Sequence, residues 1–359
     1  MPRNKDILVA LSGGLDSAAA VLFLREAGYR PRALFLDMLD SDEVRRTAAE
    51  AADALGVELI VEPCAELFRH EIIDYVLAGH ATGSTPAPCS RCNPRIKWRL
   101  LAAAADRLGI YYIATGHYVR KIQHDNGYFY FRRGIDPAKD QSYYLWDVPE
   151  SLIRRAVLPL GNYTKAEVRD ILKEKYGLTG LARRRESMGV CFLDGETYGE
   201  FLRKHLPEEL LRAGEVVDLS GKIIGHHEGC PLYTAGQKRG FTLFDDKRKG
   251  MAVVGIDIKR NRVIAGPDEA LYRRELILKA WRAVCPEELF GRADDLRIMI
   301  RGIGRNPERG CRLQALNDGR LHITLLYDKA WAPMPGQPAV FYLDDRVVGG
   351  GILDEVPTE

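Results

Sequence analysis

The chain has 359 residues, of which 46% are hydrophobic and 28% are charged, a composition typical of a globular protein with two or three domains. Lys and Arg number 52 against 50 Asp and Glu, so the bulk charge gives no signature of nucleic-acid binding. No apolar run approaches the ~18 residues of a membrane span, and the charged stretch 1–6 leads straight into a predicted strand, so we expect a cytoplasmic protein.

The first predicted element is the buried strand 7–11, which leads into the turn 12–17 with the sequence SGGLDS. The Ala-rich segment 18–27 that follows is typical of a helix. This order of strand, glycine turn and helix directs free amide groups toward one point, where glycines let an anion approach. The turn lacks the lysine of a Walker motif, whereas its serines and Asp16 suit Mg²⁺-assisted release of pyrophosphate. The alternative is an ordinary turn beside a helix start.

Strands and helices continue to alternate after this turn. Strands are predicted at 32–37, 57–61 and 109–118, with helices at 42–55 and 66–77. The alternation predicts an α/β fold with a doubly wound parallel sheet, whose ligand lies at the carboxyl ends of the strands. Leu36 is therefore expected close to a nucleotide, and Gly116 and His117 at the same edge as the turn. A simpler role for His117 is to satisfy a loop carbonyl.

Two cysteine-bearing segments stand out. The segment 79–94 breaks the alternation with glycines and prolines and carries Cys89-x-x-Cys92, before a helix resumes at 96–108. Cys191 ends a short strand-like run much later in the chain. Seven cysteines in all favour thiol chemistry or metal binding over a disulfide framework. If Cys92 and Cys191 both line the edge of the sheet, they share one pocket.

The remaining sequence is rich in short β-strands. A hairpin at 119–123 and 128–133 precedes Lys139-Asp140-Gln141, and a helix begins after 159–161. From Gly214 the chain has short β runs and glycine turns, and from about 271 it has roughly six alternating strands, which suggest a small closed barrel. We therefore expect three domains, 1–205, 206–270 and 271–359.

Basic residues gather in four clusters. A single cluster is usually a solvated face, but four of them in three regions favour a dispersed phosphate-binding footprint. The clusters are Arg91, Arg95, Lys97 and Arg99; Arg183, Arg184 and Arg185; Lys247, Arg248 and Lys249; and Arg301 with Arg305.

The turn 12–17 resembles the PP-loop of the N-type ATP pyrophosphatases, and nearly the whole chain resembles the tRNA-specific 2-thiouridylases. Matching stretches occur in the order of that family, at 12–17, 93–98, 114–118, 139–145, 187–192, 233–240, 335–337 and 349–352. The resemblance implies a PP-loop domain, a small β-rich central domain and a C-terminal β-barrel that contacts tRNA. It also implies an ATP- and Mg²⁺-dependent tRNA-uridine 2-sulfurtransferase, with tRNA and a sulfur donor as partners. The donor would be a cysteine desulfurase, a relay protein or inorganic sulfide.

The resemblance also implies roles for individual residues. Cys92 would be the first catalytic cysteine, and Cys191 would carry a persulfide. The residues expected to bind ATP are Ala10, Leu11, Ser12, Gly13, Gly14, Leu15, Asp16, Ser17, Leu36 and Gly116.

Contacts with tRNA are implied for a second set, which includes the point where this chain departs from the family. Where the family usually has Asn-Pro-Asp this chain has Ala87-Pro88-Cys89, and Arg301 is followed by Gly302 instead of tyrosine. The residues expected to bind tRNA are Ala87, Pro88, Cys89, His117, Lys139, Asp140, Gln141, Arg301 and Gln337. For the stretch 139–141 the alternative is a solvated turn.

Cys89 leaves the sulfur chemistry open. With Cys92 and Cys191 it gives three thiolates, enough to hold a 4Fe-4S cluster whose open iron binds hydrosulfide. Persulfide chemistry on Cys191 without a cluster is the main alternative. Structural zinc, a redox Cys-x-x-Cys and an incidental loop cysteine are the others.

Two other classes of function fit parts of the sequence. One is a different ATP pyrophosphatase that adenylates a small molecule, which would need neither Cys92 nor Cys191. The other is a non-catalytic RNA-binding protein whose cysteines hold zinc. Release of pyrophosphate that depends on both tRNA and ATP would exclude the second.

Overall fold

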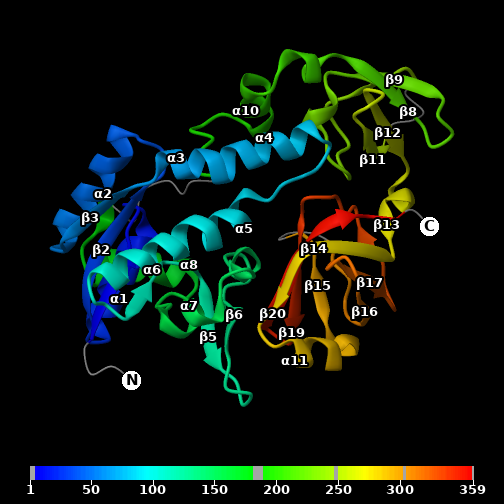
Figure 1. Ribbon diagram of the computed structural model, residues 1–359. Helices are drawn as coiled ribbons and strands as arrows, with labels where there is room; N and C mark the ends of the chain where they lie inside the picture. Colours follow the sequence, from blue (N-terminus) through cyan, green and yellow to red (C-terminus); the bar gives the residue numbers. More distant parts are fainter. Residues whose placement is uncertain (1–4, 181–188, 246–249, 302–304, 358–359) are drawn as a thin grey trace. The chain divides into compact units, whose positions relative to one another are not determined.

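The computed structural model describes residues 5–180, 189–245, 250–301 and 305–357 (Figure 1). The chain divides into two compact units. The first contains 1–72, 89–190 and 345–348, and the second contains 73–88, 191–344 and 349–359. The predicted basic clusters at 183–185 and 247–249, together with Gly302, lie outside the described residues.

A parallel sheet forms the centre of the first unit and confirms the predicted α/β fold. Its strand order is β3-β2-β1-β4-β7, and each pair of neighbouring strands is parallel. The strands span Asp6–Ala10 (β1), Arg30–Asp37 (β2), Leu59–Pro63 (β3), Tyr112–Ala114 (β4) and Ala156–Val157 (β7). Strand β1 is central because its apolar run has no polar face to present to water, and its middle residues are fully buried.

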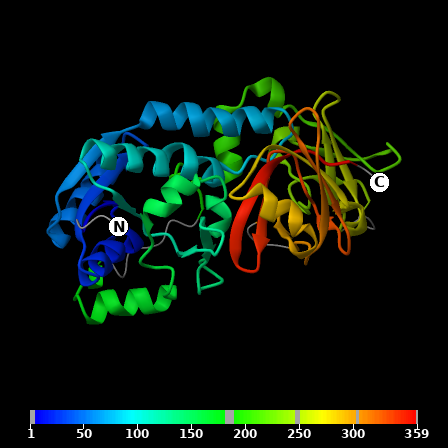
Figure 2. The same ribbon diagram turned by 60° about the horizontal axis from the view of Figure 1, so that its bottom comes forward.

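Helices cover both faces of this sheet. Helix α1 (Leu15–Glu26) packs against α2 (Asp42–Leu55) and α8 (Lys165–Glu174), whereas α6 (Trp98–Arg107) packs on β1 and β4 (Figure 2). The chain moves outward from β1 to β2 and β3, then returns to place β4 on the other side of β1. The order therefore reverses between β1 and β4, which is where sheets of this kind bind ligands.

The cysteine-bearing segment 79–94 is more helical than predicted. Helix α5 (Pro88–Cys92), a π-turn (Asn93–Lys97) and α6 follow one another without a break, so Cys89 and Cys92 lie on a helix and not in a loop. Prolines misled the prediction. Pro88 stands in the first turn, where a missing amide hydrogen costs little, and Pro94 falls in the π-turn, where the hydrogen-bonding pattern shifts.

A second π-turn (Arg69–Ile73) joins α3 (Ala65–Phe68) to α4 (Asp74–Ala81).

A hairpin, a short helix and residues 345–348 complete the first unit, and Arg346 pairs with Arg132 of the hairpin. Strand β5 (Val119–Gln123) pairs with β6 (Phe129–Arg133), as predicted, and α7 (Glu150–Arg155) precedes β7. Asp345 binds Arg120 and Arg132 of the hairpin, at 2.7 and 2.8 Å from its carboxylate.

The second unit contains two β structures and confirms the predicted β-rich central and C-terminal regions. The first has strand order β10-β9-β8-β12-β11, and the second has β15-β19-β20-β14-β17-β16 with a separate β13-β18 pair. Helices α10 (Tyr198–His205) and α11 (Pro286–Gly291) also belong here. The strands are Gly214–Val217 (β8), Ile223–His227 (β9), Thr242–Leu243 (β10), Ala252–Asp257 (β11), Arg262–Gly266 (β12), Tyr272–Arg273 (β13), Glu275–Ala283 (β14), Arg297–Met299 (β15), Cys311–Ala315 (β16), Leu321–Leu325 (β17), Ala330–Trp331 (β18), Pro338–Leu343 (β19) and Arg346–Glu355 (β20).

Alternating burial shows why these segments form strands. In β17 every second residue is buried, starting from Leu321, as expected for a strand with one face on the core.

Among the helices of the described ranges, none has both the length and the apolar character that crossing a membrane requires.

Candidate active site

The turn after β1 forms a compact loop at the amino end of α1. The Ser12 amide donates to Ser17 Oγ at 3.2 Å, and Ser17 Oγ donates to the Gly14 carbonyl at 2.9 Å. Gly13 has φ of +80°, and a Cβ on it would lie 2.8 Å from the Thr47 carbonyl oxygen, so only glycine fits. Gly14 stands at the N-cap of α1 without a side-chain cap, so the first amides of the helix are available to an anion.

The loop after β4 closes against this turn. A Cβ on Gly116 would lie 2.8 Å from the carbonyl carbon and oxygen of Asp16 and 3.0 Å from the Ser17 amide nitrogen. The absence of a side chain on Gly116 therefore lets the two loops meet. This contact confirms that 116 and 117 lie at the same edge as the 12–17 turn. Leu36, on β2, is buried next to β1.

Asp16 is held by two residues that the sequence analysis did not assign to the site. Its Oδ1 accepts hydrogen bonds from Lys165 Nζ at 2.6 Å and from Tyr118 Oη at 2.8 Å. Lys165 is the first residue of α8, and its side chain is only 8% exposed. The signal in the sequence was a lysine placed directly after the capping residue Thr164, in the first turn of a helix, where positive charge is disfavoured.

His117 lies in the same loop, with one ring face on the helix that carries the cysteines. Its ring stacks on Trp98 with centroids 6.2 Å apart, and Nδ1 is 2.8 Å from Thr115 Oγ1. Burial, with a smaller contribution from the Lys97 ammonium, lowers the pKa of His117 to about 3. The imidazole is therefore neutral at physiological pH.

Cys89 and Cys92 lie one helical turn apart, which puts them on the same side of α5. Cys92 is 5% exposed and Cys89 is half-buried. The side chains of Asn93 and Arg91 hold this turn in place. Asn93 Nδ2 donates to the carbonyls of Cys89 and Tyr144 at 3.0 and 3.3 Å, and Arg91 binds the carboxylate of Glu71 at 2.8 Å.

Cys191 differs in its environment. It is exposed and lies in a turn of the second unit. The ring of the next residue, Phe192, packs on Phe201 of α10, with the two ring centroids 4.8 Å apart. Because Cys92 and Cys191 belong to different units, their shared pocket stays a prediction.

The thiols of Cys89 and Cys92 fit two ligands of an iron–sulfur cluster in their chemistry and their spacing along the helix. Within either unit, the described residues contain no group of three or more His, Cys, Asp or Glu side chains arranged to hold a metal ion. A third ligand would come from Cys191 of the other unit, so the cluster also stays a prediction.

The stretch 139–141 folds its own turn. The carboxylate of Asp140 accepts from the amides of Gly134 and Ser142, both at 3.1 Å, and from Ser142 Oγ at 2.9 Å. Gln141 Oε1 accepts from the Tyr118 amide at 3.0 Å. These two side chains therefore support the backbone beside Tyr118, and their contact with tRNA is a prediction.

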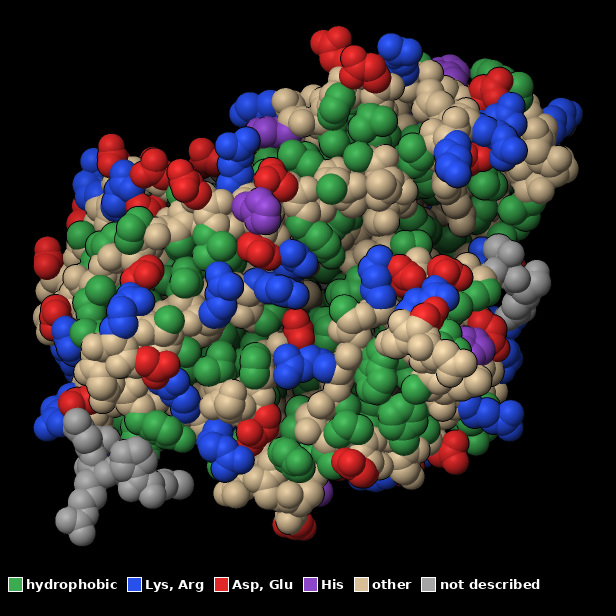
Figure 3. Space-filling model, in the orientation of Figure 1, with side chains coloured by type: hydrophobic (Ala, Val, Ile, Leu, Met, Phe, Trp, Pro, Cys, Tyr) green, Lys and Arg blue, Asp and Glu red, His purple; other side chains and the backbone are tan. Residues whose placement is uncertain are grey.

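Two of the residues expected to bind tRNA lie in the C-terminal β structure. The Arg301 guanidinium donates to the carbonyls of Ala235 and Ala332, at 2.8 and 3.0 Å, and lies over the Trp331 ring. Gln337 is buried, and its Oε1 accepts from the Met334 amide at 3.0 Å. On the face drawn in Figure 3, Lys and Arg side chains alternate with Asp and Glu instead of forming a continuous basic field.

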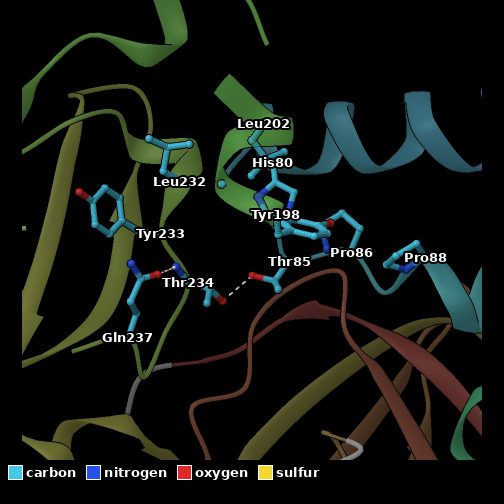
Figure 4. A pocket seen from close by; sticks show the side chains of 11 residues that line it. His80, Thr85, Pro86, Pro88, Tyr198, Leu202, Leu232, Tyr233, Thr234 and Gln237 are labelled. Carbon is cyan, nitrogen blue, oxygen red and sulfur yellow. Dashed lines mark hydrogen bonds between the residues drawn. The ribbon is translucent and has the colours of Figure 1, made fainter. Parts of the chain in front are cut away.

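A cavity of about 280 Å³ lies within the second unit and was not predicted (Figure 4). His80, Tyr198 and Pro88 line it, with the Thr85 and Thr234 hydroxyls hydrogen-bonded at 2.7 Å on one wall. His80 Nδ1 donates to the Pro231 carbonyl at 2.9 Å, and burial lowers the pKa of this histidine. Of the residues expected to bind tRNA, Pro88 reaches the cavity.

Family models match three successive parts of the chain. Their descriptions are "tRNA methyl transferase HUP domain" for residues 5–195, "tRNA methyl transferase PRC-barrel domain" for 199–267 and "Aminomethyltransferase beta-barrel domain" for 273–353.

Curated relatives match nearly the full length. The tRNA-specific 2-thiouridylase MnmA 2 of Phocaeicola vulgatus is 38% identical, over 98% of each chain. The tRNA-specific 2-thiouridylase MnmA of Moorella thermoacetica is 37% identical, over 97% of this chain and 99% of its own. That of Thermus thermophilus is 38% identical, over 97% and 95%.

Proposed function

The chain belongs to the tRNA-specific 2-thiouridylase family, and we propose that it is an ATP-dependent tRNA sulfurtransferase that replaces the C2 oxygen of the wobble uridine with sulfur. The reaction releases AMP and pyrophosphate. Full-length similarity to thiouridylases favours this function over a small-molecule pyrophosphatase and over a non-catalytic RNA-binding protein.

One structural observation carries the proposal beyond the family. Trp98 stacks on His117, so the helix that bears Cys92 is attached to the loop whose Gly116 touches the 12–17 turn. Cys92 and Trp98 lie at the two ends of the π-turn Asn93–Lys97, on one continuous helical stretch. A thiol, a neutral imidazole and an anion-binding turn therefore belong to one unit.

In the first step, the C2 oxygen of uridine attacks the α-phosphorus of ATP, and the bond between the α-phosphorus and the bridging oxygen breaks. The free amides at the start of α1 and the hydroxyl of Ser12 would bind the negative charge that moves onto pyrophosphate. Mg²⁺, when bound, supplies further charge compensation, and Asp16 is the carboxylate of the turn that would hold it.

In the second step, sulfur adds to C2 and AMP leaves with the former uridine oxygen. In the persulfide version, the terminal sulfur of a Cys191 persulfide attacks C2. The Cys92 thiolate then attacks the Cys191 sulfur, and the sulfur–sulfur bond breaks to leave 2-thiouridine and a Cys92–Cys191 disulfide. A thiol reductant restores both cysteines. The exposure of Cys191 suits a residue that an external donor must load.

A second version of the sulfur step uses a 4Fe-4S cluster held by Cys89, Cys92 and Cys191, which would present hydrosulfide to C2. It is supported by the Cys-x-x-Cys spacing on one helical turn. This version predicts that protein purified without oxygen is brown and contains about four irons per chain. Colourless, iron-free protein that still thiolates tRNA with a desulfurase would exclude it.

The function is tested by incubating the full chain with ATP, Mg²⁺, tRNA and a sulfur source, and digesting the tRNA for mass spectrometry. We expect a uridine heavier by the difference between sulfur and oxygen, and pyrophosphate release that requires tRNA. A methylated nucleoside, as the names of two family models would suggest, or an unmodified tRNA would contradict the proposal.

A further inference from the structure

Lys165 is an unusual residue for its position. It occupies the first turn of α8, directly after the N-cap Thr164, and its side chain is 8% exposed. A positive charge near the amino end of a helix is disfavoured by the helix dipole, and burying a lysine is costly unless the ammonium is paired. Packing of α8 on α1 brings its Nζ to 2.6 Å from Asp16 Oδ1, across 149 residues of sequence.

The surroundings of this ammonium suit an anion. Asp16 is the second residue of α1, whose first amides have no side-chain cap, and its own side chain is 38% exposed. The Lys165 ammonium therefore lies beside the turn that would bind phosphate. The turn itself contains no lysine, unlike a Walker motif, so a side-chain cation that accompanies Mg²⁺ at the triphosphate would come from another part of the fold.

A second donor makes an exchange of partners feasible. Tyr118 Oη donates to the same oxygen of Asp16 at 2.8 Å, so the carboxylate would keep one hydrogen bond if the lysine left it. The Lys165 amide donates to Asp136 Oδ2 at 2.9 Å, which fixes the backbone from which the side chain extends. The flexible four-carbon stem would then allow the ammonium to move while the helix stays in place.

We propose that Lys165 is the phosphate-binding lysine of this site. In the absence of nucleotide it pairs with Asp16. When ATP binds, the ammonium moves to an oxygen of the β- or γ-phosphate and stays with pyrophosphate as it leaves, while Asp16 becomes available to Mg²⁺. This inference rests on the proposed function for the identity of the reaction, but the binding of pyrophosphate can be measured without tRNA or sulfur.

The test measures binding of Mg²⁺-pyrophosphate to the full chain by calorimetry. We expect Lys165→Met to weaken binding about tenfold to a hundredfold, the range for one lost hydrogen bond to a charged group. Tyr118→Phe is the matched control, because it removes a neutral donor from the same Asp16 oxygen, and we expect less than about a threefold change. Equal losses in the two variants, or no loss in Lys165→Met, would overturn the proposal.

A double-mutant cycle separates direct binding from positioning. If Lys165 contacts phosphate, Lys165→Met weakens binding in the Asp16→Asn background as well; if it only orients Asp16, the effect disappears there, and the proposal fails. Should the methionine variant not fold, Lys165→Arg and Lys165→Gln repeat the comparison, with binding kept only by arginine. Wild-type protein that binds pyrophosphate but does not thiolate tRNA would contradict the proposed function and leave this inference standing.

Discussion

The two cysteine-bearing regions are built in opposite ways. Cys92 lies on a helix, is 5% exposed, and has neighbours fixed by the amide of Asn93 and the Arg91–Glu71 ion pair. Cys191 lies exposed in a turn and is anchored beside α10 through Phe192. A sulfur carrier must meet a donor outside the protein, whereas a thiol that resolves its persulfide must be shielded from other oxidants. The difference supports the proposed carrier role of Cys191 and the proposed resolving role of Cys92 in the persulfide version.

The largest effect tests these two roles. Cys191→Ser and Cys92→Ser should each lower thiolation about a thousandfold or more, while tRNA-dependent pyrophosphate release continues, because the 12–17 turn is intact. After loading with a desulfurase, Cys92→Ser should retain a persulfide on Cys191, visible by mass spectrometry of the peptide. A serine variant that still thiolates would remove its cysteine from the chemistry.

The second prediction concerns access to the thiols. Iodoacetamide should modify Cys191 on the order of a hundredfold faster than Cys92, because a buried thiol on a helix reacts only after local opening. Timed quenching and peptide mass spectrometry give both rates in one sample. In denaturant the two cysteines should react at equal rates, which is the control. Equal rates in the native protein would contradict the proposed difference in access between Cys92 and Cys191.

The third prediction concerns His117, which attaches the Cys92 helix to the loop after β4. Its pKa of about 3 lies below the ordinary value of about 6.5, so between these values the unfolded chain binds a proton that the native protein does not. The contribution of His117 to the free energy of unfolding is therefore fully present above pH 6.5. It is lost as the pH falls toward 3, because protons bind the unfolded chain more tightly than the native protein. We expect the unfolding free energy to fall by about 2 kcal/mol from this group between pH 7 and pH 5. Denaturant titrations of wild type and His117→Asn measure the difference, and identical pH dependence in both would contradict it.

The smallest effect compares the two cysteines as structural residues. Cys92→Ala should lower the unfolding free energy by about 1 kcal/mol, because it removes a buried sulfur from a packed helix, whereas Cys191→Ala should change it by less than about 0.5 kcal/mol. Thermal and denaturant unfolding give both values. A larger cost at Cys191 would show that its turn carries packing that exposure alone does not reveal.

Several features of the fold were predictable because they depend on neighbours in sequence. Helix α2 begins and ends where predicted, since Ser41 caps its start and Gly56 takes φ of +58° at its end. The hairpin of β5 and β6 and the parallel sheet followed from alternation and periodicity. The helix through Cys89 was missed, because prolines usually end helices and here occupy a first turn and a π-turn.

The candidate site was predictable only in part. The sequence predicted that Gly116 lies at the same edge of the sheet as the 12–17 turn, but it did not predict the close backbone approach that requires glycine at 13 and 116. Residues 139–141 were predicted to bind tRNA. In the structure, Asp140 and Gln141 accept hydrogen bonds from backbone amides, and the contact with tRNA stays a prediction. The three domain boundaries, the residue roles and the cluster stay predictions.

The sequence alone determined the strand, the glycine turn and the helix proposed to bind phosphate, because six consecutive residues set the geometry of the turn through their own backbone angles and hydroxyls. Only the tertiary structure decided what surrounds the turn. Lys165 and Tyr118 reach Asp16 across 149 and 102 residues of chain, through the packing of α8 and the loop after β4. Such contacts arise from how apolar faces pack, so the local pattern around each residue does not contain them.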